Sequence, residues 1–181
     1  MEDQILLTRK SAELLAEKPK FLKKLRDTSV KLSIKENVVI LEAESASNLL
    51  AVKNCLVAFN RGFGTAVAAM LLNDEYDIQV INLNDYTTSK KRQYELKARV
   101  IGSRGAIKDR LSRATSCFIK VKGKTISIIG TYQRLAIAFE AVDAILNGAK
   151  HETAFVIINK RLGELYINGS SRGISEETTG D

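Results

Sequence analysis

The 181-residue sequence contains one histidine, one proline, two cysteines and no tryptophan. Because the single histidine, His151, has no cysteine or carboxylate partner at a local spacing, neither a nucleophilic triad nor a metal centre is predicted. Cys55 and Cys117 each lie in an apolar pattern and are expected in the core, where no disulfide is needed. We therefore expect a protein that is not an enzyme and that holds no metal or other cofactor.

Aromatic residues make up only 6% of the chain, although hydrophobic residues make up 45%. RNA-binding sheets that stack bases display aromatic side chains, so the composition does not favour an RRM or an OB platform. The apolar stretch 65–72 is too short to span a membrane and is expected to be buried between two domains. The first residues show neither the signal-peptide nor the transit-peptide pattern.

Positive charge is concentrated in one part of the chain. Residues 87–124 contain twelve Lys or Arg and two acidic residues, a net charge of +10, whereas the whole chain carries +7. The other residues therefore sum to −3, and the basic stretch is expected to meet a polyanion such as a nucleic acid. For the run 90–92 taken alone, a solvated helix surface is the alternative interpretation.

The turn Gly102-Ser-Arg-Gly105 lies within that basic stretch. The two glycines let the backbone turn sharply and bring its N–H groups within reach of a phosphate oxygen. Ser103 and Arg104 are expected to point outward, with Arg104 adding a charge-assisted contact to the RNA backbone. Apolar neighbours are expected to form a floor beneath unstacked bases; they are Val100, Ile101 and Ile107. Further cations are expected at the interface; they are Arg99, Lys108, Arg110 and Lys120.

The segments around this turn follow a defined order. Periodicity predicts a strand at 76–83, a helix at 89–101, a helical segment after the turn, strands at 118–122 and 125–129, and a helix at 131–146. Gly148 is the expected stop of that last helix. This is the order of a type I (eukaryotic-type) KH domain, whose groove holds about four nucleotides of single-stranded RNA.

Residues 3–34 resemble a degenerate repeat of residues 77–121. The turn of this first copy reads Ala16-Glu-Lys-Pro19, so both glycines are missing. Pro19 removes an N–H donor and Glu17 would repel a phosphate, so this turn is poorly suited to RNA. Strands at 30–34 and 38–41 and a helix at 48–59 complete this first unit. A unit without the RNA loop could serve as a docking surface for a protein, or it could serve only to pack against the second domain.

The sequence therefore predicts an α+β fold of two tandem type I KH domains packed together, the first with a degenerate GXXG loop. We expect residues 1–73 to form the degenerate domain with an extra helix, and residues 74–150 to form the RNA-binding domain. Residues 151–181 are expected to be a C-terminal extension, with a short helix or strand at 150–165 and a mobile tail at 168–181.

Over about residues 3–158, the chain resembles the partner-of-NOB family of KH proteins, which assemble the small ribosomal subunit in archaea and eukaryotes. The paired layout carries this resemblance, together with Phe59-Asn-Arg-Gly-Phe63, the loop 102–105 and the segments 123–130 and 145–151. The resemblance implies that the second domain binds the 3′ region of small-subunit rRNA within a pre-ribosomal particle. It also implies that the first domain docks the PIN-domain endonuclease of the NOB family, which matures that 3′ end. The expected location is the nucleolus and cytoplasm of a eukaryote or the cytoplasm of an archaeon.

Two other functions agree with the same residues. The chain could be a general single-stranded-RNA adaptor for messenger RNA or an RNA-degrading complex. It could also be a protein scaffold whose RNA-binding loop is vestigial. Salt dependence separates the scaffold from the RNA binders, because phosphate contacts weaken steeply as salt rises.

Overall fold

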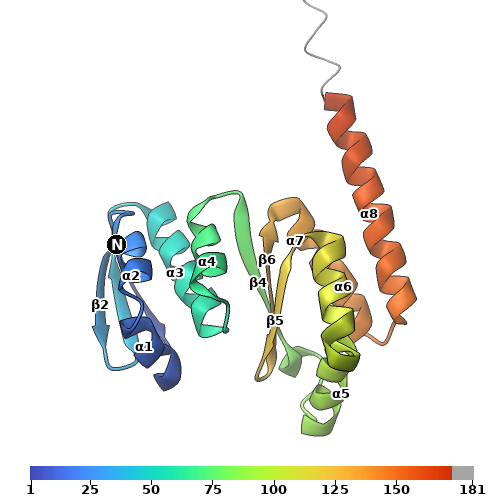
Figure 1. Cartoon of the computed structure of the whole chain (residues 1–181), viewed down its shortest axis with the longest axis horizontal. Coiled ribbons are helices and arrows are strands. Elements are labelled where there is room, and N and C mark those ends of the chain that lie inside the picture. Colours follow the sequence, from blue (N-terminus) through green and yellow to red (C-terminus); the bar gives the residue numbers. More distant parts are fainter. Residues whose placement is uncertain (173–181) are drawn as a thin grey trace, which may run out of the picture.

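The computed structural model describes residues 1–172, which form two units of helices packed on three-stranded sheets (Figure 1). The first unit places two helices after its first strand and a third helix after its last strand. Its elements are β1 (Glu2–Leu6), α1 (Arg9–Ala16), α2 (Pro19–Arg26), β2 (Lys31–Lys35), β3 (Val38–Glu42) and α3 (Ala46–Asn60).

The sheet of the first unit is antiparallel, with strand order β1-β3-β2. Val39 and Leu41 of the central strand are fully buried, while Val38 and Ile40 are half-buried, as expected for a sheet covered on one face. The Thr8 side chain begins α1 by accepting the Ser11 N–H at 3.2 Å, and Pro19 begins α2 at a position that needs no N–H donor.

The second unit repeats this order of elements. It consists of β4 (Tyr76–Asn82), α5 (Lys90–Ile101), α6 (Ala106–Thr115), β5 (Phe118–Lys122), β6 (Thr125–Thr131) and α7 (Tyr132–Leu146). Short 3₁₀ turns lie at Leu83–Asp85 and at Ser103–Gly105. Its antiparallel sheet has the order β4-β6-β5, which matches the order of the first sheet. Each element of the strand–helix–turn–helix–strand–strand–helix order expected from the sequence is therefore present.

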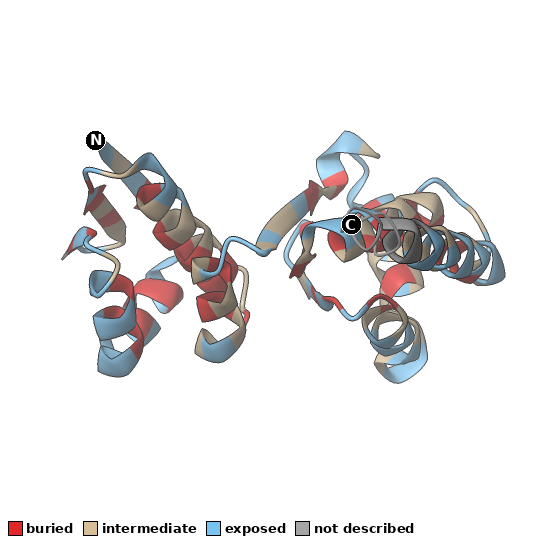
Figure 2. Ribbon diagram, turned by 90° about the horizontal axis from the view of Figure 1, so that it is seen from above, coloured by how far each residue is buried: buried red, intermediate tan, exposed pale blue. Residues whose placement is uncertain are grey.

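The two units pack against each other through a layer of helices. This layer contains α3, the short α4 (Thr65–Ala68) and a 3₁₀ turn (Ala69–Leu72). It lies on the face of the second sheet that α5, α6 and α7 leave open (Figure 1). Ile129 of β6 belongs to the first core for this reason, and β6 is buried on both faces (Figure 2). The burial expected for residues 65–72 is confirmed for Ala68, Ala69 and Leu71.

A long final helix, α8 (His151–Arg172), extends the second unit. Its apolar residues Ala154, Phe155 and Ile158 are buried in the core of the second unit, so that core continues past residue 150. The helix then projects away from the body of the molecule (Figure 1). The expectation of a short element at 150–165 is wrong, because the helix continues to residue 172. Of the tail expected at 168–181, the stretch 168–172 is helical, and the remaining residues lie outside the described part of the chain.

Both cysteines are buried free thiols, as predicted. Across residues 1–172, no helix has the length and hydropathy that a membrane crossing requires.

Candidate nucleic-acid interface

The loop between α5 and α6 depends on glycine at its first position. Gly102 ends α5 with φ 71° and ψ 178°, a conformation that is essentially restricted to glycine. Its N–H donates to the Ala98 carbonyl at 2.8 Å. A Cβ atom on Gly102 would lie 2.4 Å from Cγ1 of Ile107 and 2.9 Å from the Ile107 backbone nitrogen, so the space is closed as well.

The two residues inside the loop are exposed, as predicted. Arg104 adopts a left-handed conformation (φ 51°, ψ 25°), and Gly105 follows with φ 84°. The loop closes through the Gly105 N–H, which donates to the Gly102 carbonyl at 3.2 Å. Within residues 1–172, the N–H groups of Ser103 and Arg104 donate to no protein oxygen. They stand next to the first turn of α6, whose dipole favours an anion at this end.

A groove of about 360 Å³ lies beside the loop. One wall comes from a single face of α5, because its residues 94, 97, 98 and 101 recur at helical spacing. The opposite wall comes from Val121 of β5 and from Gly123, which turns the chain into β6. Lys97 spans the groove, and its Nζ donates to the Gly123 carbonyl at 3.2 Å. Ile101 lines the groove, so its position agrees with the expected floor beneath bases.

Tyr94 is a groove residue that the sequence reasoning missed. Tyr94 lines the groove and is 71% exposed, whereas the aliphatic lining residues Ile101 and Val121 are half-buried. An exposed ring at such a place can stack on an unpaired base. The signal that could have found it is its spacing of three and seven residues from Lys97 and Ile101.

Arg99 has a different place from the one expected. Its guanidinium donates to the carbonyls of Ile145 at 3.0 Å, Gly148 at 3.3 Å and Ala149 at 2.6 Å. The Ile145 carbonyl is one of the orphan carbonyls in the last turn of α7, where a cation also complements the helix dipole, and the other two belong to the connection between α7 and α8. The Arg99 carbonyl in turn lies 2.9 Å from Nε2 of His151. Both residues therefore tie α5 to the α7–α8 connection.

The expected apolar floor is only partly formed. Val100 is fully buried in the second core, so its expected contact with bases is wrong. Ile107 packs beneath Gly102 and lines a second cavity, which the loop residues Gly102 and Ser103 also line together with Arg99 and His151. The alternation of buried and open faces along α5 explains this outcome, because a helix presents residues 100 and 101 in different directions.

The remaining predicted cations do not surround the groove. Lys108 pairs with the neighbouring carboxylate of Asp109 and holds the pKa of that carboxyl below its usual range. The Arg110 guanidinium lies 3.8 Å above the centre of the Phe155 ring of α8, a cation–π contact. Lys120 lies on the face of β5 that is directed toward the first unit, next to Gly62. Lys108 and Arg110 can add positive field to the loop, but neither lines the groove.

The corresponding turn of the first unit joins α1 directly to α2. Its Lys18 N–H donates to the Leu15 carbonyl at 3.0 Å, and Pro19 follows as the first residue of α2. Only Glu17 and Lys18 separate the two helices. The backbone there offers fewer open N–H groups than the 102–105 loop, in agreement with the sequence reasoning.

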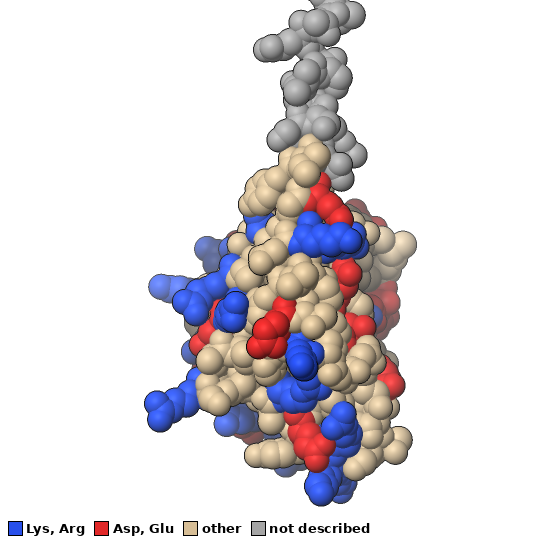
Figure 3. Space-filling view, turned by 90° about the vertical axis from the view of Figure 1, so that its right-hand side faces the viewer, with Lys and Arg blue, Asp and Glu red and all other residues tan. Residues whose placement is uncertain are grey.

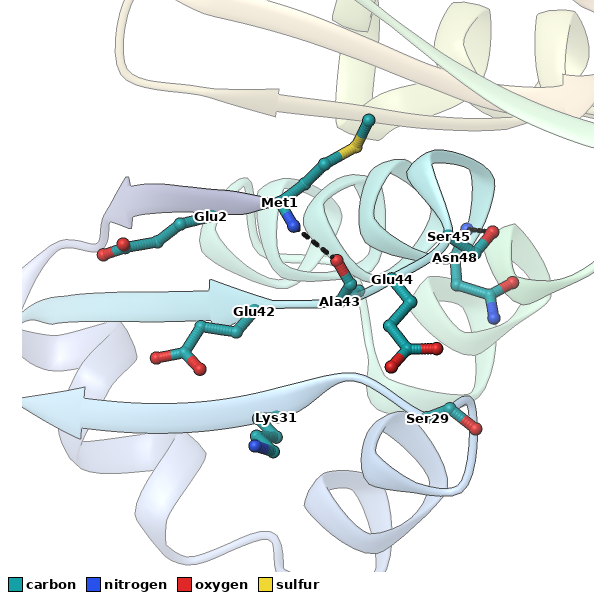
Figure 4. A pocket seen from close by; sticks show the side chains of 9 residues that line it. All are labelled: Met1, Glu2, Ser29, Lys31, Glu42, Ala43, Glu44, Ser45 and Asn48. Atoms are coloured by element: carbon teal, nitrogen blue, oxygen red, sulfur yellow. Dashed lines mark hydrogen bonds between the residues drawn. The ribbon is translucent and has the colours of Figure 1, made fainter.

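A cavity of about 730 Å³ at the far end of the first unit has the opposite charge character. Figure 4 shows the carboxylates of Glu2, Glu42 and Glu44 around it, with Lys31 as the cation across from them. The N-terminal ammonium of Met1 donates to the Ala43 carbonyl at 2.7 Å. Three carboxylates would repel a phosphate, so this cavity is not part of the candidate interface.

The surface charge of the second unit is distributed unevenly. Figure 3 shows Lys and Arg side chains projecting along the left-hand edge of this face, while side chains of both signs are mixed over its centre and its right-hand part. Nine of the twelve cations in residues 87–124 are exposed, and Lys97, Arg99 and Lys108 are half-buried, so most of the positive charge of this stretch is accessible at the surface.

Comparison with known proteins agrees with this geometry. Residues 77–161 match a family model of the second KH domain of partner-of-NOB proteins, described as a eukaryotic-type KH domain (KH-domain type I). These residues are a KH domain of the partner-of-NOB family. The resemblance seen in the sequence is thereby confirmed.

The chain is also similar to the KH domain-containing protein of Methanocaldococcus jannaschii, with 32% identity over 140 residues. The match covers 75% of this chain, and the chain spans 62% of the length of that relative.

Solved structures show the same fold along most of the chain. A protein of unknown function from Aeropyrum pernix matches with a TM-score of 0.89 and 20% identity, covering 98% of both chains. Dim2p from Pyrococcus horikoshii matches with a TM-score of 0.76 and 24% identity, covering 88% of this chain and 99% of its own. A chain in the a/eIF2alpha–aDim2p–rRNA complex of the same organism matches with a TM-score of 0.79 and 23% identity, covering 91% of this chain and 95% of its own.

Proposed function

We propose that this KH protein binds the 3′ region of small-subunit rRNA and acts as an assembly factor of the small ribosomal subunit. The observation that carries the proposal is the pairing of two open N–H groups, in an exposed glycine-bounded loop, with a groove of about 360 Å³ lined by Tyr94, Ile101 and Val121. A solved structure of the same fold comes from a complex that contains rRNA, which supports rRNA as the ligand class.

The groove favours single-stranded RNA over a duplex. A phosphate at the loop would accept from the N–H groups of Ser103 and Arg104, with the Arg104 guanidinium beside it. The bases on either side would then lie over Ile101 and Val121, and one of them could stack on Tyr94. A paired base cannot reach such a floor, because its flat face is covered by its neighbours in the helix.

The first unit is proposed to be a KH domain that has lost its RNA loop and docks the PIN-domain endonuclease of the NOB family. Its support is the order of elements and strands, which repeats that of the second unit, and the turn Glu17–Lys18, which lacks glycine. The role proposed for the whole chain is to position a partner on RNA, and it requires no catalytic group of its own.

Binding of labelled RNA tests the proposal directly. The ligands are a short single strand from the mature 3′ end of small-subunit rRNA and a scrambled strand of the same composition. Ser103→Asp/Arg104→Asp is expected to abolish binding while leaving the far-UV spectrum unchanged, because both side chains are exposed and the new charges face a phosphate. Lys18→Asp/Lys20→Asn changes the net charge by the same three units at exposed positions in the first unit, and its affinity is expected to stay near that of the wild type.

The outcomes separate the three functions. Selective binding that is lost only in the 103/104 variant supports the assembly factor. Equal binding of both strands would replace it by the general adaptor, and binding of neither strand would leave the protein scaffold. For the endonuclease, co-elution with the purified PIN-domain protein should persist in the 103/104 variant, and its absence from the wild type would overturn the docking role.

A further inference from the structure

Four cationic side chains gather where the two units meet. They come from α1, from the end of α3 and from β5, and we refer to them as the seam cluster: Lys10, Arg61, Lys120 and Lys122. Lys122 Nζ donates to the carbonyl of Asn60, the last residue of α3, at 2.7 Å. Arg61 donates from Nη1 to Oγ1 of Thr125 at 3.3 Å. Each of these two hydrogen bonds joins one unit to the other.

The lysines of β5 lie across the turn that follows α3. A Cβ atom placed on Gly62 would be 3.5 Å from Cε of Lys120 and 3.5 Å from Cδ of Lys122. Lys10 and Arg61 are close enough for their charges to act on Lys122. Burial, Arg61, Lys10 and Lys120, in that order, hold the pKa of Lys122 below its usual value.

The seam cluster has no counter-charge. Among residues 1–172, no carboxylate forms an ion pair with any of its four members. A structural role accounts for Lys122, which satisfies the end of α3, and in part for Arg61. The side chains of Lys10 and Lys120 make no hydrogen bond or ion pair within the same described residues, so their placement raises charge repulsion that no such bond offsets.

The seam cluster and the RNA groove lie on opposite faces of the same strand, β5. β5 is the edge strand of its sheet, and its side chains alternate between two faces. Val121 and Gly123 line the groove, and Lys122 lies between them in the chain with its side chain on the opposite face. The thickness of a single strand therefore separates the groove from the seam cluster, and within residues 1–172 no strand pairs with the outer edge of β5.

We propose that the seam cluster is a second phosphate-binding site, which holds the sugar-phosphate backbone of the RNA strand where it passes from the groove over the edge of β5. The inference rests on the proposed RNA binding by the second unit and extends it. The ligand is a single strand longer than the roughly four nucleotides that a KH groove clamps. The first unit thus takes part in RNA binding through Lys10 and Arg61, although its own helix–helix turn is unsuited to RNA.

The test measures the affinity of the wild type and of a variant with two neutralised lysines for RNA strands of two lengths. Lys10→Gln/Lys120→Gln changes the two members whose side chains form no described hydrogen bond or ion pair, so the hydrogen bonds between the units stay intact. For a ten-nucleotide strand, the loss of two phosphate contacts should lower the affinity on the order of tenfold at 0.1 M salt. It should also lower the log–log salt slope by about 1.4, since each contact to a single strand contributes about 0.7. A four-nucleotide strand should bind both proteins equally.

A matched control is Lys35→Gln/Lys160→Gln, which neutralises two exposed lysines of β2 and α8. It should leave the affinity for both strands near that of the wild type. An unchanged affinity of Lys10→Gln/Lys120→Gln for the longer strand, or an equal loss in the control, would overturn the second site. If the wild type then still binds RNA and Ser103→Asp/Arg104→Asp still abolishes that binding, the proposed function stands without the second site. Failure of the wild type to bind any RNA would overturn both the proposed function and the second site.

Discussion

Replacing Gly102 with alanine should destabilise the second unit far more than the same change at Gly105. Both glycines have positive φ, but their surroundings differ. Alanine at 102 would occupy a backbone region that is essentially restricted to glycine, at about 1–3 kcal/mol. Its Cβ would also meet the Ile107 side chain at 2.4 Å and the Ile107 backbone nitrogen at 2.9 Å, an overpacking that costs about 1–3 kcal/mol more.

At position 105 the added Cβ has room, since its nearest neighbour would be the Asp109 carboxylate at 3.8 Å. Only the left-handed backbone conformation opposes alanine there, at about 1–2 kcal/mol. We therefore expect a loss of about 4 kcal/mol for Gly102→Ala and of about 1.5 kcal/mol for Gly105→Ala. For a chain of this length, the melting temperature should fall by about 8–16 °C and about 3–6 °C, respectively.

The assay is thermal and urea unfolding of both variants, followed by far-UV circular dichroism, with the midpoint compared at unchanged slope. Gly102→Ala/Ile107→Ala serves as the control, because it removes the side chain that the new methyl group meets. The added loss from Ile107→Ala should be smaller in the Gly102→Ala background than in the wild type. Equal losses for the two glycine variants would refute the argument from steric closure.

Further changes test the placement of Arg99 and of the two thiols. Arg99→Ala should lower the free energy of unfolding by about 2 kcal/mol, because three carbonyls of the last turn of α7 and of the α7–α8 connection lose a charged donor. Arg99→Lys should restore only part of this loss. An Arg99→Ala variant as stable as the wild type in urea unfolding would contradict this. Burial raises the pKa of Cys55 to about 12 and also raises the pKa of Cys117. Ellman's reagent at pH 8 should therefore label neither thiol until urea unfolds the chain, and rapid labelling of the folded protein would contradict the buried placement. Since the unfolded thiols ionise first, the free energy of unfolding should fall as the pH rises from about 9, and the fall should be smaller in Cys55→Ala.

Local patterns in the sequence were enough to predict the order of elements in the second unit. Alternation gave the strands 118–122 and 125–129, and the glycine pair at 102 and 105 marked the sharp turn between two helices. The final helix was underestimated. Its apolar residues 154, 155, 158, 162 and 165 fall at helical spacing, but the stretch 168–181 is rich in Gly, Ser, Thr and Glu and predicted a mobile tail, whereas residues 168–172 continue the helix.

Within the candidate site, sequence reasoning found the loop and missed part of the groove. Exposure of Ser103 and Arg104 follows from the turn itself. The contribution of Tyr94 depends on which face of α5 is directed toward β5, and only packing decides that. Low aromatic content across the chain gave no hint that one ring is displayed at this place.

The amino-acid sequence by itself determined where the chain turns, which residues alternate toward a core and where positive charge is concentrated, because these properties depend on neighbours a few residues apart. The tertiary structure decided the partners of each charge. Arg99 turns inward to carbonyls that lie 46 to 50 residues away, and Lys120 faces the first unit and not the groove. Contacts between distant segments fix these directions, and no local pattern records them, since a cation at a given spacing can equally meet a carbonyl, an aromatic ring or a phosphate.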